Sequence, residues 1–286
     1  MYSGVIIMKV KSGHYKILLS AFIWGTMGAF ARWSGLNPLE LSFFRLLIAS
    51  LTLYAFLPRD QRLLIFSTQE YFALCLAGIL FAGDCVLFFY ALKLTTISNA
   101  VLPYNMQPLF IAVLAPIFFK EKMDAKCVLA FFVSLIGVAM LVLPPIVRLS
   151  YQDVLGIAYS FIGAFLLSVI AVIVKKVHIN ALTFVYYEMV IAALCLTLFI
   201  KITSTVNLRA MVMVLFLGIL HTAFAYSLFY DGLKKISTQY ALTLCYLTPV
   251  IAVLTGFIFF TEEITLLIVT GGLIIIINGI LVILKS

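Results

Sequence analysis

Ten apolar stretches, each long enough to cross a membrane as a helix, follow one another along the chain. A helix needs about 20 apolar residues to cross the ~30 Å hydrocarbon core of a bilayer. Hydrophobic residues make up 65% of the 286 residues and charged residues only 10%, and a soluble protein of this length has too little interior to bury so much apolar surface. The sequence therefore predicts an all-α integral membrane protein. The expected spans lie near 16–34, 38–57, 71–92, 97–119, 125–144, 154–174, 180–200, 210–232, 238–260 and 264–284.

Prolines and short groups of charges separate these stretches. The formal net charge is +8, but the charges do not form one patch, so we expect the lipid bilayer as a partner and no nucleic acid. Five cysteines occur singly without the spacing of metal ligands. We therefore expect no metal and no cofactor.

The basic residues orient the chain, because cytoplasmic loops carry an excess of Lys and Arg. With ten spans and a cytoplasmic N-terminus, 13 of the 19 Lys and Arg residues fall in cytoplasmic segments and 5 in external ones. This bias predicts a multi-pass protein of the cytoplasmic membrane with both termini inside. The external set is Arg32, Lys93, Arg148, Lys201 and Arg209, and Arg45 lies within a span.

The two halves of the chain resemble each other, which indicates an internal repeat over residues 16–144 and 154–284. Each half holds five spans, an odd number, so the halves must insert in opposite orientations. Inverted repeats recur in secondary transporters, whose substrate site lies near the midplane between the halves. The matching positions include Gly78-Ile79-Leu80 with Gly218-Ile219-Leu220, Phe89-Tyr90 with Phe229-Tyr230, Pro108 with Pro249, and Glu121 with Glu262.

These features together resemble the EamA-type transporters of the drug/metabolite transporter superfamily. The resemblance rests on the five-plus-five repeat, the short loops, Trp24-Gly25 early in the first span, and the proline followed by Phe-Phe-x-Glu in spans four and nine. It covers nearly the whole chain. It implies a ten-helix exporter or exchanger of small metabolites, amino acids among them, with an apolar central cavity that opens alternately to each side.

Four ionisable residues lie within spans, where such groups are costly and are candidates for function. Arg45 and Glu188 fall at equivalent positions when Asn37 is aligned with Asn180, so the two could pair across the repeat axis. The alternative is that each side chain extends toward the membrane surface or bonds to the carbonyls at a helix end. Either residue is a candidate for coupling or gating.

The other two ionisable residues, Asp84 and His221, are candidates to carry a proton. Burial disfavours the charged form of a carboxyl group, and histidine titrates nearest to neutral pH. The alternative is that Asp84 bonds to a neighbouring helix and that His221 is a packing residue. Protons are accordingly a candidate coupling ion.

Polar and aromatic side chains in three spans predict a substrate cavity, with Trp24 as an apolar wall. Thr222 and Tyr226 are four residues apart and so share one helix face. Pro108 and Pro249 each free a main-chain carbonyl one turn earlier, which is tolerated where a helix lines water or is buried in protein. The alternative is that these side chains only form hydrogen bonds between packed helices. The remaining candidates are Tyr104, Asn105 and Gln107 in span four and Tyr246 and Thr248 in span nine.

We therefore predict a secondary transporter that exports a small amphipathic metabolite, such as an amino acid, by alternating access. Proton-coupled efflux of organic cations is the nearest competitor, but the four-helix relatives that perform it rely on a first-span glutamate, and this first span has no acid. Exchange of phosphate esters would call for several cations in the cavity. A membrane-embedded enzyme would need a metal or nucleophile motif, and none is visible.

Overall fold

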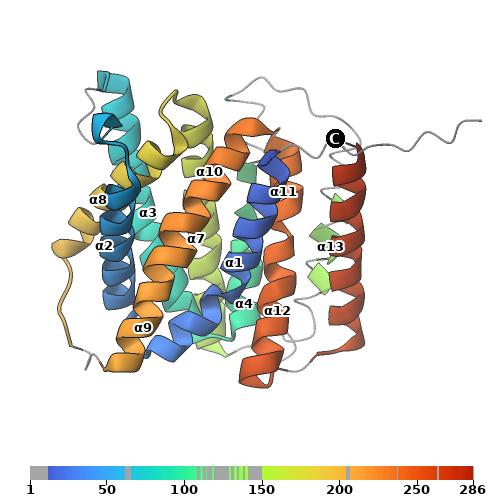
Figure 1. Ribbon diagram of the computed structural model, residues 1–286. Coiled ribbons are helices and arrows are strands. Elements are labelled where there is room, and N and C mark those ends of the chain that lie inside the picture. The colour runs from blue at the N-terminus through green and yellow to red at the C-terminus, as the bar shows by residue number, and fades with distance from the viewer. Residues whose placement is uncertain are drawn as a thin grey trace, which may run out of the picture.

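The computed structural model describes residues 12–61, 66–107, 150–203, 207–236, 238–262 and 264–285, with isolated positions between 110 and 140. Within these residues every regular element is a helix and there is no strand. The helices stand side by side as a bundle (Figure 1). Five are long and apolar enough to cross a membrane: Pro38–Phe56, Thr68–Leu94, Tyr151–Lys176, Leu208–Lys235 and Thr243–Phe260.

The helices of the first half follow the expected spans closely. They are α1 (Ser12–Ser34), α2 (Pro38–Phe56), α3 (Thr68–Leu94) and α4 (Ile97–Tyr104), with a 3₁₀ turn η1 (Arg59–Gln61) after α2. Of the expected span 125–144 and the end of the span 97–119, the structure describes only isolated positions.

The second half contains one helix that changes its winding. Its elements are α7 (Tyr151–Lys176), α8 (Ala181–Thr197), α9 (Leu208–Phe216), η3 (Leu217–Phe224), α10 (Ala225–Lys235), α11 (Thr238–Cys245), α12 (Leu247–Phe260) and α13 (Leu266–Lys285). The elements α9, η3 and α10 form one continuous helix, in which η3 is a π-helical segment.

Side-chain caps fix where the helices begin. Ser67 and Glu70 form a capping box at the start of α3, and Ser150 and Asp153 form another at the start of α7. Asn37 accepts from the amide of Leu39 at the start of α2, as Asn180 does from Leu182 at the start of α8. Such caps satisfy amides that have no partner within the helix.

Two glycines at matching positions make matching contacts. A Cβ at Gly78 of α3 would lie 2.5 Å from Cγ2 of Ile191 on α8, and a Cβ at Gly218 of η3 would lie 2.5 Å from Cγ2 of Ile48 on α2. The alignment that pairs Gly78 with Gly218 and Asn37 with Asn180 also pairs Ile48 with Ile191. The two helix crossings therefore have the same close packing, as an internal repeat predicts.

A second pair of glycines repeats the pattern near the starts of α1 and α7. A Cβ at Gly13 would lie 2.7 Å from Cγ2 of Ile236, and one at Gly156 would lie 2.9 Å from Cγ2 of Thr95. Both contacts, like the two above, join a helix of one half to a helix of the other. Elements of the two halves therefore pack directly against each other, and the halves do not form separate lobes.

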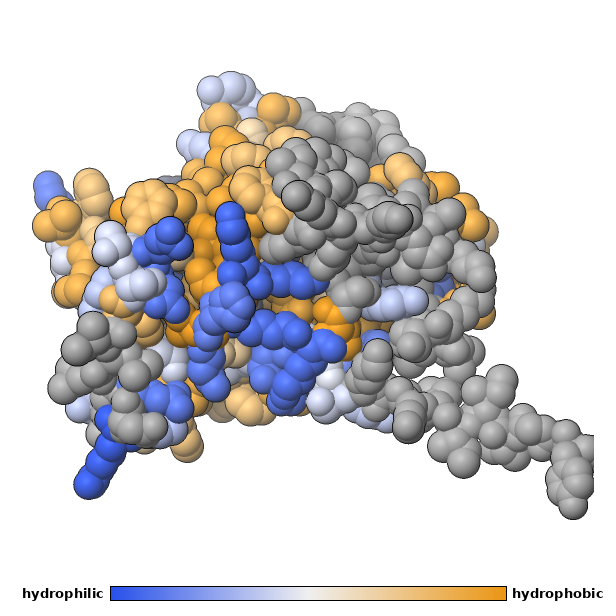
Figure 2. All heavy atoms as spheres, turned by 90° about the horizontal axis from the view of Figure 1, so that it is seen from above, coloured by the Kyte–Doolittle hydropathy of each residue, from blue (hydrophilic) through white to orange (hydrophobic). Residues whose placement is uncertain are grey.

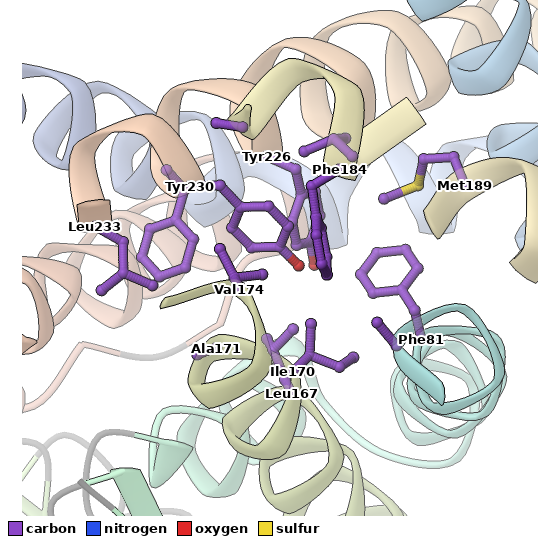
Figure 3. Close-up of a cluster of buried hydrophobic side chains, with 14 of the residues drawn as sticks. Phe81, Leu167, Ile170, Ala171, Val174, Phe184, Met189, Tyr226, Tyr230 and Leu233 are labelled. Carbon is purple, nitrogen blue, oxygen red and sulfur yellow. The ribbon is translucent and has the colours of Figure 1, made fainter. Parts of the chain in front are cut away.

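A buried apolar cluster joins α3, α7, α8 and α10 (Figure 3). Phe81, Phe184 and Tyr230 are among its fully buried side chains. On the outside, Phe56, Leu198 and Leu266 are 76%, 82% and 79% exposed, which suits a protein whose outer solvent is lipid. Hydrophilic residues gather between apolar ones at the end where α1 begins and α10 ends (Figure 2).

Candidate functional site

A small cavity of about 40 Å³ lies where helices of the two halves meet. This volume holds only a few water molecules, so the cavity has no room for a larger solute in this conformation. Eight residues predicted from the sequence line it: Trp24, Arg45, Asp84, Tyr104, Asn105, Gln107, Tyr226 and Thr248. Sequence reasoning missed six others, which carry no polar or periodic signal of their own: Met27, Cys85, Phe88, Val101, Leu167 and Cys245.

The two oxygens of the Asp84 carboxylate differ in their contacts. The Tyr104 hydroxyl donates to its Oδ2 over 2.9 Å. Its Oδ1 has no hydrogen-bond partner among the described residues, although the side chain is only 1% exposed. Gly163 of α7 leaves the space that this oxygen occupies, because a Cβ there would lie 3.0 Å from it. One oxygen of this cavity-lining carboxylate is therefore buried without a hydrogen-bond partner among the described residues.

The guanidinium of Arg45 lines the same cavity and forms no ion pair with a carboxylate of the described residues. It lies 5.0 Å from the ring centroid of Phe89 and 5.9 Å from that of Phe81, within the range of a cation–π interaction. Its Nη1 reaches the sulfur of Met27 at 3.4 Å, and its Nε has no hydrogen-bond partner in the part of the chain that the structure describes. Arg45 thus offers a buried cation with a free donor.

Aromatic rings form the walls of the cavity. The rings of Trp24 and Tyr226 lie 4.7 Å apart, and those of Phe88 and Tyr104 lie 4.4 Å apart. The Trp24 indole donates to the carbonyl oxygen of His221 over 3.0 Å, which fixes the orientation of that wall. A solute in this cavity would meet flat apolar faces beside one anion and one cation.

His221 and Thr222 lie in the π-helical segment η3 and do not line the cavity. The Thr222 hydroxyl donates to the carbonyl of Leu217 in its own helix. The imidazole of His221 lies 3.2 Å from the carbonyl of Phe216 through Nδ1 and 2.9 Å from the Thr26 hydroxyl through Nε2. The same Thr26 hydroxyl lies 2.8 Å from the carbonyl oxygen of Ile23, to which it can donate its single proton, so the imidazole is held between a hydroxyl of α1 and a carbonyl of its own helix. His221 therefore fits a structural role in holding α1 against η3.

Glu188 is fully buried outside the cavity. The Tyr230 hydroxyl donates to its Oε1 over 3.1 Å, and its Oε2 has no hydrogen-bond partner among the residues described. The sequence suggested that Arg45 and Glu188 could pair. In the described chain they form no ion pair, because Arg45 contacts Met27 and Glu188 accepts from Tyr230. The equivalent positions instead provide the carbonyls that face Gly218 and Gly78.

The helix expected for span nine is interrupted near its proline. The helix breaks at Tyr246, between α11 and α12, three residues before Pro249. Tyr246 is fully buried but packs with Val250, Val253, Ile268 and Ile275 and does not line the cavity. Its neighbours Cys245 and Thr248 do. Pro108, the matching proline, lies outside the described residues.

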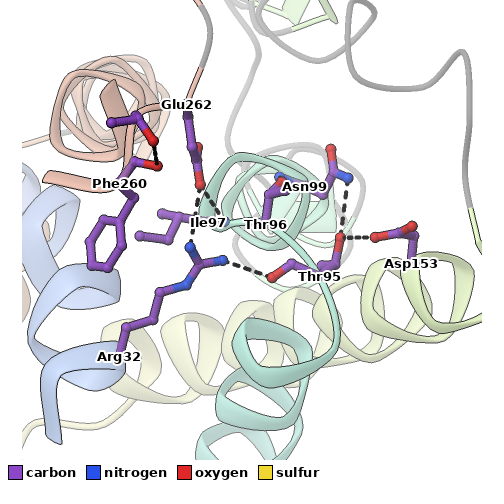
Figure 4. Close-up of polar contacts among 9 residues, drawn as sticks. Arg32, Thr95, Thr96, Ile97, Asn99, Asp153, Phe260 and Glu262 are labelled. Carbon is purple, nitrogen blue, oxygen red and sulfur yellow. Dashed lines mark hydrogen bonds and ion pairs between the residues drawn. The ribbon is translucent and has the colours of Figure 1, made fainter. Parts of the chain in front are cut away.

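Polar contacts cross between the halves at both ends of the bundle. At one end Arg32 lies 3.5 Å from Glu262 and donates to the carbonyl of Thr95 over 2.9 Å, and the Thr95 hydroxyl donates to Asp153 over 2.6 Å (Figure 4). At the other end Lys16 pairs with Asp231 over 2.5 Å. The cavity thus lies between two polar cross-links, each of which joins the halves.

The sequence pattern of the EamA-like transporter family matches residues 11–143 and again residues 154–285. The chain belongs to the EamA-like transporter family. It is a helical membrane transporter with two repeats of this family's unit.

Relatives agree with that assignment, and a solved structure shares the fold. The protein named "Uncharacterized transporter YxxF" from Bacillus subtilis (strain 168) is 24% identical over 250 residues, which are 85% of this chain and 80% of that one. An "Uncharacterized transporter" of Archaeoglobus fulgidus is 27% identical and covers 92% of this chain and 93% of its own. "Solute carrier family 35 member G1" of Mus musculus is 25% identical over 57% of this chain and 47% of its own. A solved structure titled "Crystal structure of protein" has a TM-score of 0.76 at 18% identity, covers 95% of both chains, and so shares the fold.

Proposed function

We propose that this transporter exports a small zwitterionic metabolite, such as an amino acid, across the cytoplasmic membrane by alternating access. The observation that carries the proposal is the presence of Arg45 and Asp84 in one small cavity, each with a buried polar atom that lacks a partner among the described residues. A carboxylate would bind the guanidinium of Arg45, and an ammonium would bind Asp84. Charge-assisted hydrogen bonds of this kind are the strong ones.

The aromatic walls support the amphipathic part of this proposal. Trp24, Tyr226 and Phe88 would cover the apolar side chain of such a solute. Because the cavity now has room for only a few waters, the solute would enter only after one end of the bundle opens. The cross-links at the two ends are the contacts that must break in turn for alternating access.

The orientation of the chain remains part of the proposal. We propose five spans in each half, over residues 16–144 and 154–284, inserted in opposite directions with both termini cytoplasmic. The matching contacts of Gly78 and Gly218 support the repeat. The excess of basic residues in the segments assigned to the cytoplasm supports the orientation.

Proton-coupled efflux of an organic cation is the second candidate, and the free Oδ1 of Asp84 favours it. The buried cation Arg45 in the same cavity opposes it, because like charges repel at short range in a medium of low dielectric constant. Proton exchange at Asp84 is compatible with either substrate class.

Counterflow in proteoliposomes tests the proposal. Vesicles holding the purified chain would be loaded with one amino acid at a time, and uptake of the labelled compound would be compared with that of tetraphenylphosphonium and of a sugar phosphate. We expect saturable counterflow for at least one amino acid, and its loss in Arg45→Gln. A Tyr151→Phe variant, changed at a position 78% exposed, serves as the matched control. Counterflow of the cation alone would establish the second candidate instead.

A further inference from the structure

A second and larger cavity opens at the end of the bundle that holds Arg32. We name it the outer vestibule, since this end is the one assigned to the outside. It measures about 490 Å³ and lies between the end of α1, the start of α2 and the end of α3. It shares no lining residue with the central cavity. Its volume falls within the range of sites that bind small molecules.

The charges that line the outer vestibule have one sign. Arg32 and Lys93 line it, and no acidic residue does so in the described part of the chain. Arg32 is held by Glu262 and by the carbonyl of Thr95, so part of its charge is balanced. Lys93 is exposed and makes no ion pair within the described residues. Lys93 is therefore the cation that remains available to a ligand.

The rest of the lining is largely apolar. Leu36, Leu41, Phe89 and Leu92 contribute to it. The buried ring of Phe89 has the guanidinium of Arg45 5.0 Å from its centroid. It also lies 5.8 Å from the ring of Phe88, which lines the central cavity. Phe89 thus lines the outer vestibule and also contacts two residues of the central cavity, Arg45 and Phe88.

We propose that the outer vestibule is a second binding site, which takes an anionic group of carboxylate or phosphate type carried on an apolar body. Lys93 would bind the anion, with Arg32 adding to the local positive potential, and the leucines and Phe89 would cover the apolar part. This site does not depend on the identity of the substrate in the central cavity. A solute that leaves the central cavity past Phe89 would pass from Arg45 to Lys93.

Two sources could supply such a ligand: a free organic anion or the headgroup of an acidic lipid. The purified full chain in phosphatidylcholine nanodiscs would be titrated with 3-(4-fluorophenyl)propionate, and binding followed by fluorine NMR. The neutral 3-(4-fluorophenyl)propanol has the same apolar body and serves as the matched ligand. A parallel titration in nanodiscs with one fifth phosphatidylglycerol distinguishes the sources. A weaker affinity there in the wild type, but not in Lys93→Gln, would identify the lipid headgroup as an occupant, and an unchanged affinity would identify the free anion.

Variants at Lys93 decide whether the vestibule is the site. We expect saturable binding of the anion, with Lys93→Gln raising its Kd about threefold to tenfold because one charge-assisted contact is lost. Lys93→Arg should stay within about twofold of the wild type, as should Lys201→Gln, which removes an exposed lysine outside the vestibule. The proposal fails if the alcohol binds as tightly as the anion or if Lys93→Gln binds like the wild type. Binding that is lost only in Arg45→Gln would place the probe in the central cavity and would also overturn it.

Discussion

The indole nitrogen of Trp24 donates a hydrogen bond of 3.0 Å to the main-chain carbonyl oxygen of His221. In a regular α-helix that oxygen would accept from the amide of Ala225. Here the amide of Ala225 donates to the carbonyls of Leu220 and Thr222 instead. The π-helical winding of η3 therefore frees the acceptor that orients one wall of the central cavity, and such segments occur often at functional sites.

Trp24→Phe tests this link, because it keeps an aromatic ring and removes the donor. We expect a loss of about 1–2 kcal/mol in the free energy of unfolding, since a buried carbonyl loses its partner. Denaturation of the purified chain in detergent would measure it. Trp33→Phe is the control, as Trp33 makes ring contacts with Phe259 and Phe260 but no side-chain hydrogen bond within the described residues. Equal losses in the two variants would show that ring size, not the hydrogen bond, matters.

Asp84→Asn tests proton coupling at the central cavity. The amide keeps the shape of the carboxylate but cannot ionise, so accumulation driven by a proton gradient should be abolished. Exchange without a gradient should persist with a raised KM, because a neutral amide binds the ammonium of the substrate more weakly than a carboxylate does. Glu188→Gln is the matched control, because Glu188 is equally buried but lies outside the cavity. Both activities would be measured in the same proteoliposomes. Full accumulation by Asp84→Asn would make Asp84 a structural group.

Tyr104 and Tyr246 should respond differently to truncation. Tyr104→Phe removes the hydroxyl that donates to Asp84, and we expect a raised KM for transport with nearly normal folding. Tyr246→Ala empties a fully buried position and should lower the free energy of unfolding by about 3–5 kcal/mol. Comparing transport at equal amounts of folded protein separates the two effects. A normal KM in Tyr104→Phe would contradict the assignment of Tyr104 to the site.

The matching contacts of Gly78 and Gly218 predict that an alanine at either position lowers the free energy of unfolding by a similar amount. Gly78→Ala and Gly218→Ala should each destabilise by about 1–3 kcal/mol, because the added Cβ overlaps a facing isoleucine. Ile191→Ala should rescue Gly78→Ala but not Gly218→Ala, which a double-mutant cycle would show. Gly83→Ala is the control, since its Cβ would meet Leu166 at an ordinary 3.4 Å. Rescue of both by one isoleucine change would refute the matched packing.

Single cysteines test the orientation. Arg59→Cys should react with a membrane-impermeant maleimide only from the cytoplasmic side, and Lys93→Cys only from the outside. Labelling of intact cells and of inverted vesicles would distinguish them, with the unmodified chain and its own five cysteines as the blank. Labelling of Lys93→Cys from the cytoplasm would overturn the proposed topology.

The sequence predicted much of this structure because lipid imposes simple rules. Apolar length located the helices, and the cost of a buried charge singled out Arg45 and Asp84, which share the central cavity. The alignment of Asn37 with Asn180 correctly anticipated equivalent helix starts. In each case the prediction rests on the free-energy cost of leaving a polar or charged group unpaired in hydrocarbon, which applies at every position in a membrane.

What the sequence could not show is how each helix is turned toward its neighbours. Thr222 and Tyr226 share one face in a regular α-helix, but the π-helical winding changes the register, and only Tyr226 lines the cavity. Tyr246 lies at the break between α11 and α12 and packs with Val250 and Val253, whereas its neighbour Cys245 lines the cavity. The periodicity of the sequence shows which residues share a face of a helix, but it does not show which neighbouring helix that face contacts.

The aromatic setting of Arg45 has a consequence for biosynthesis. The rings that lie near its guanidinium, Phe81 and Phe89, belong to α3, which leaves the ribosome after α2. The hairpin of α2 and α3 is thus the smallest unit that can shield this charge from lipid. We expect the translocon to hold α2 until α3 has been made, so that the two helices enter the bilayer together.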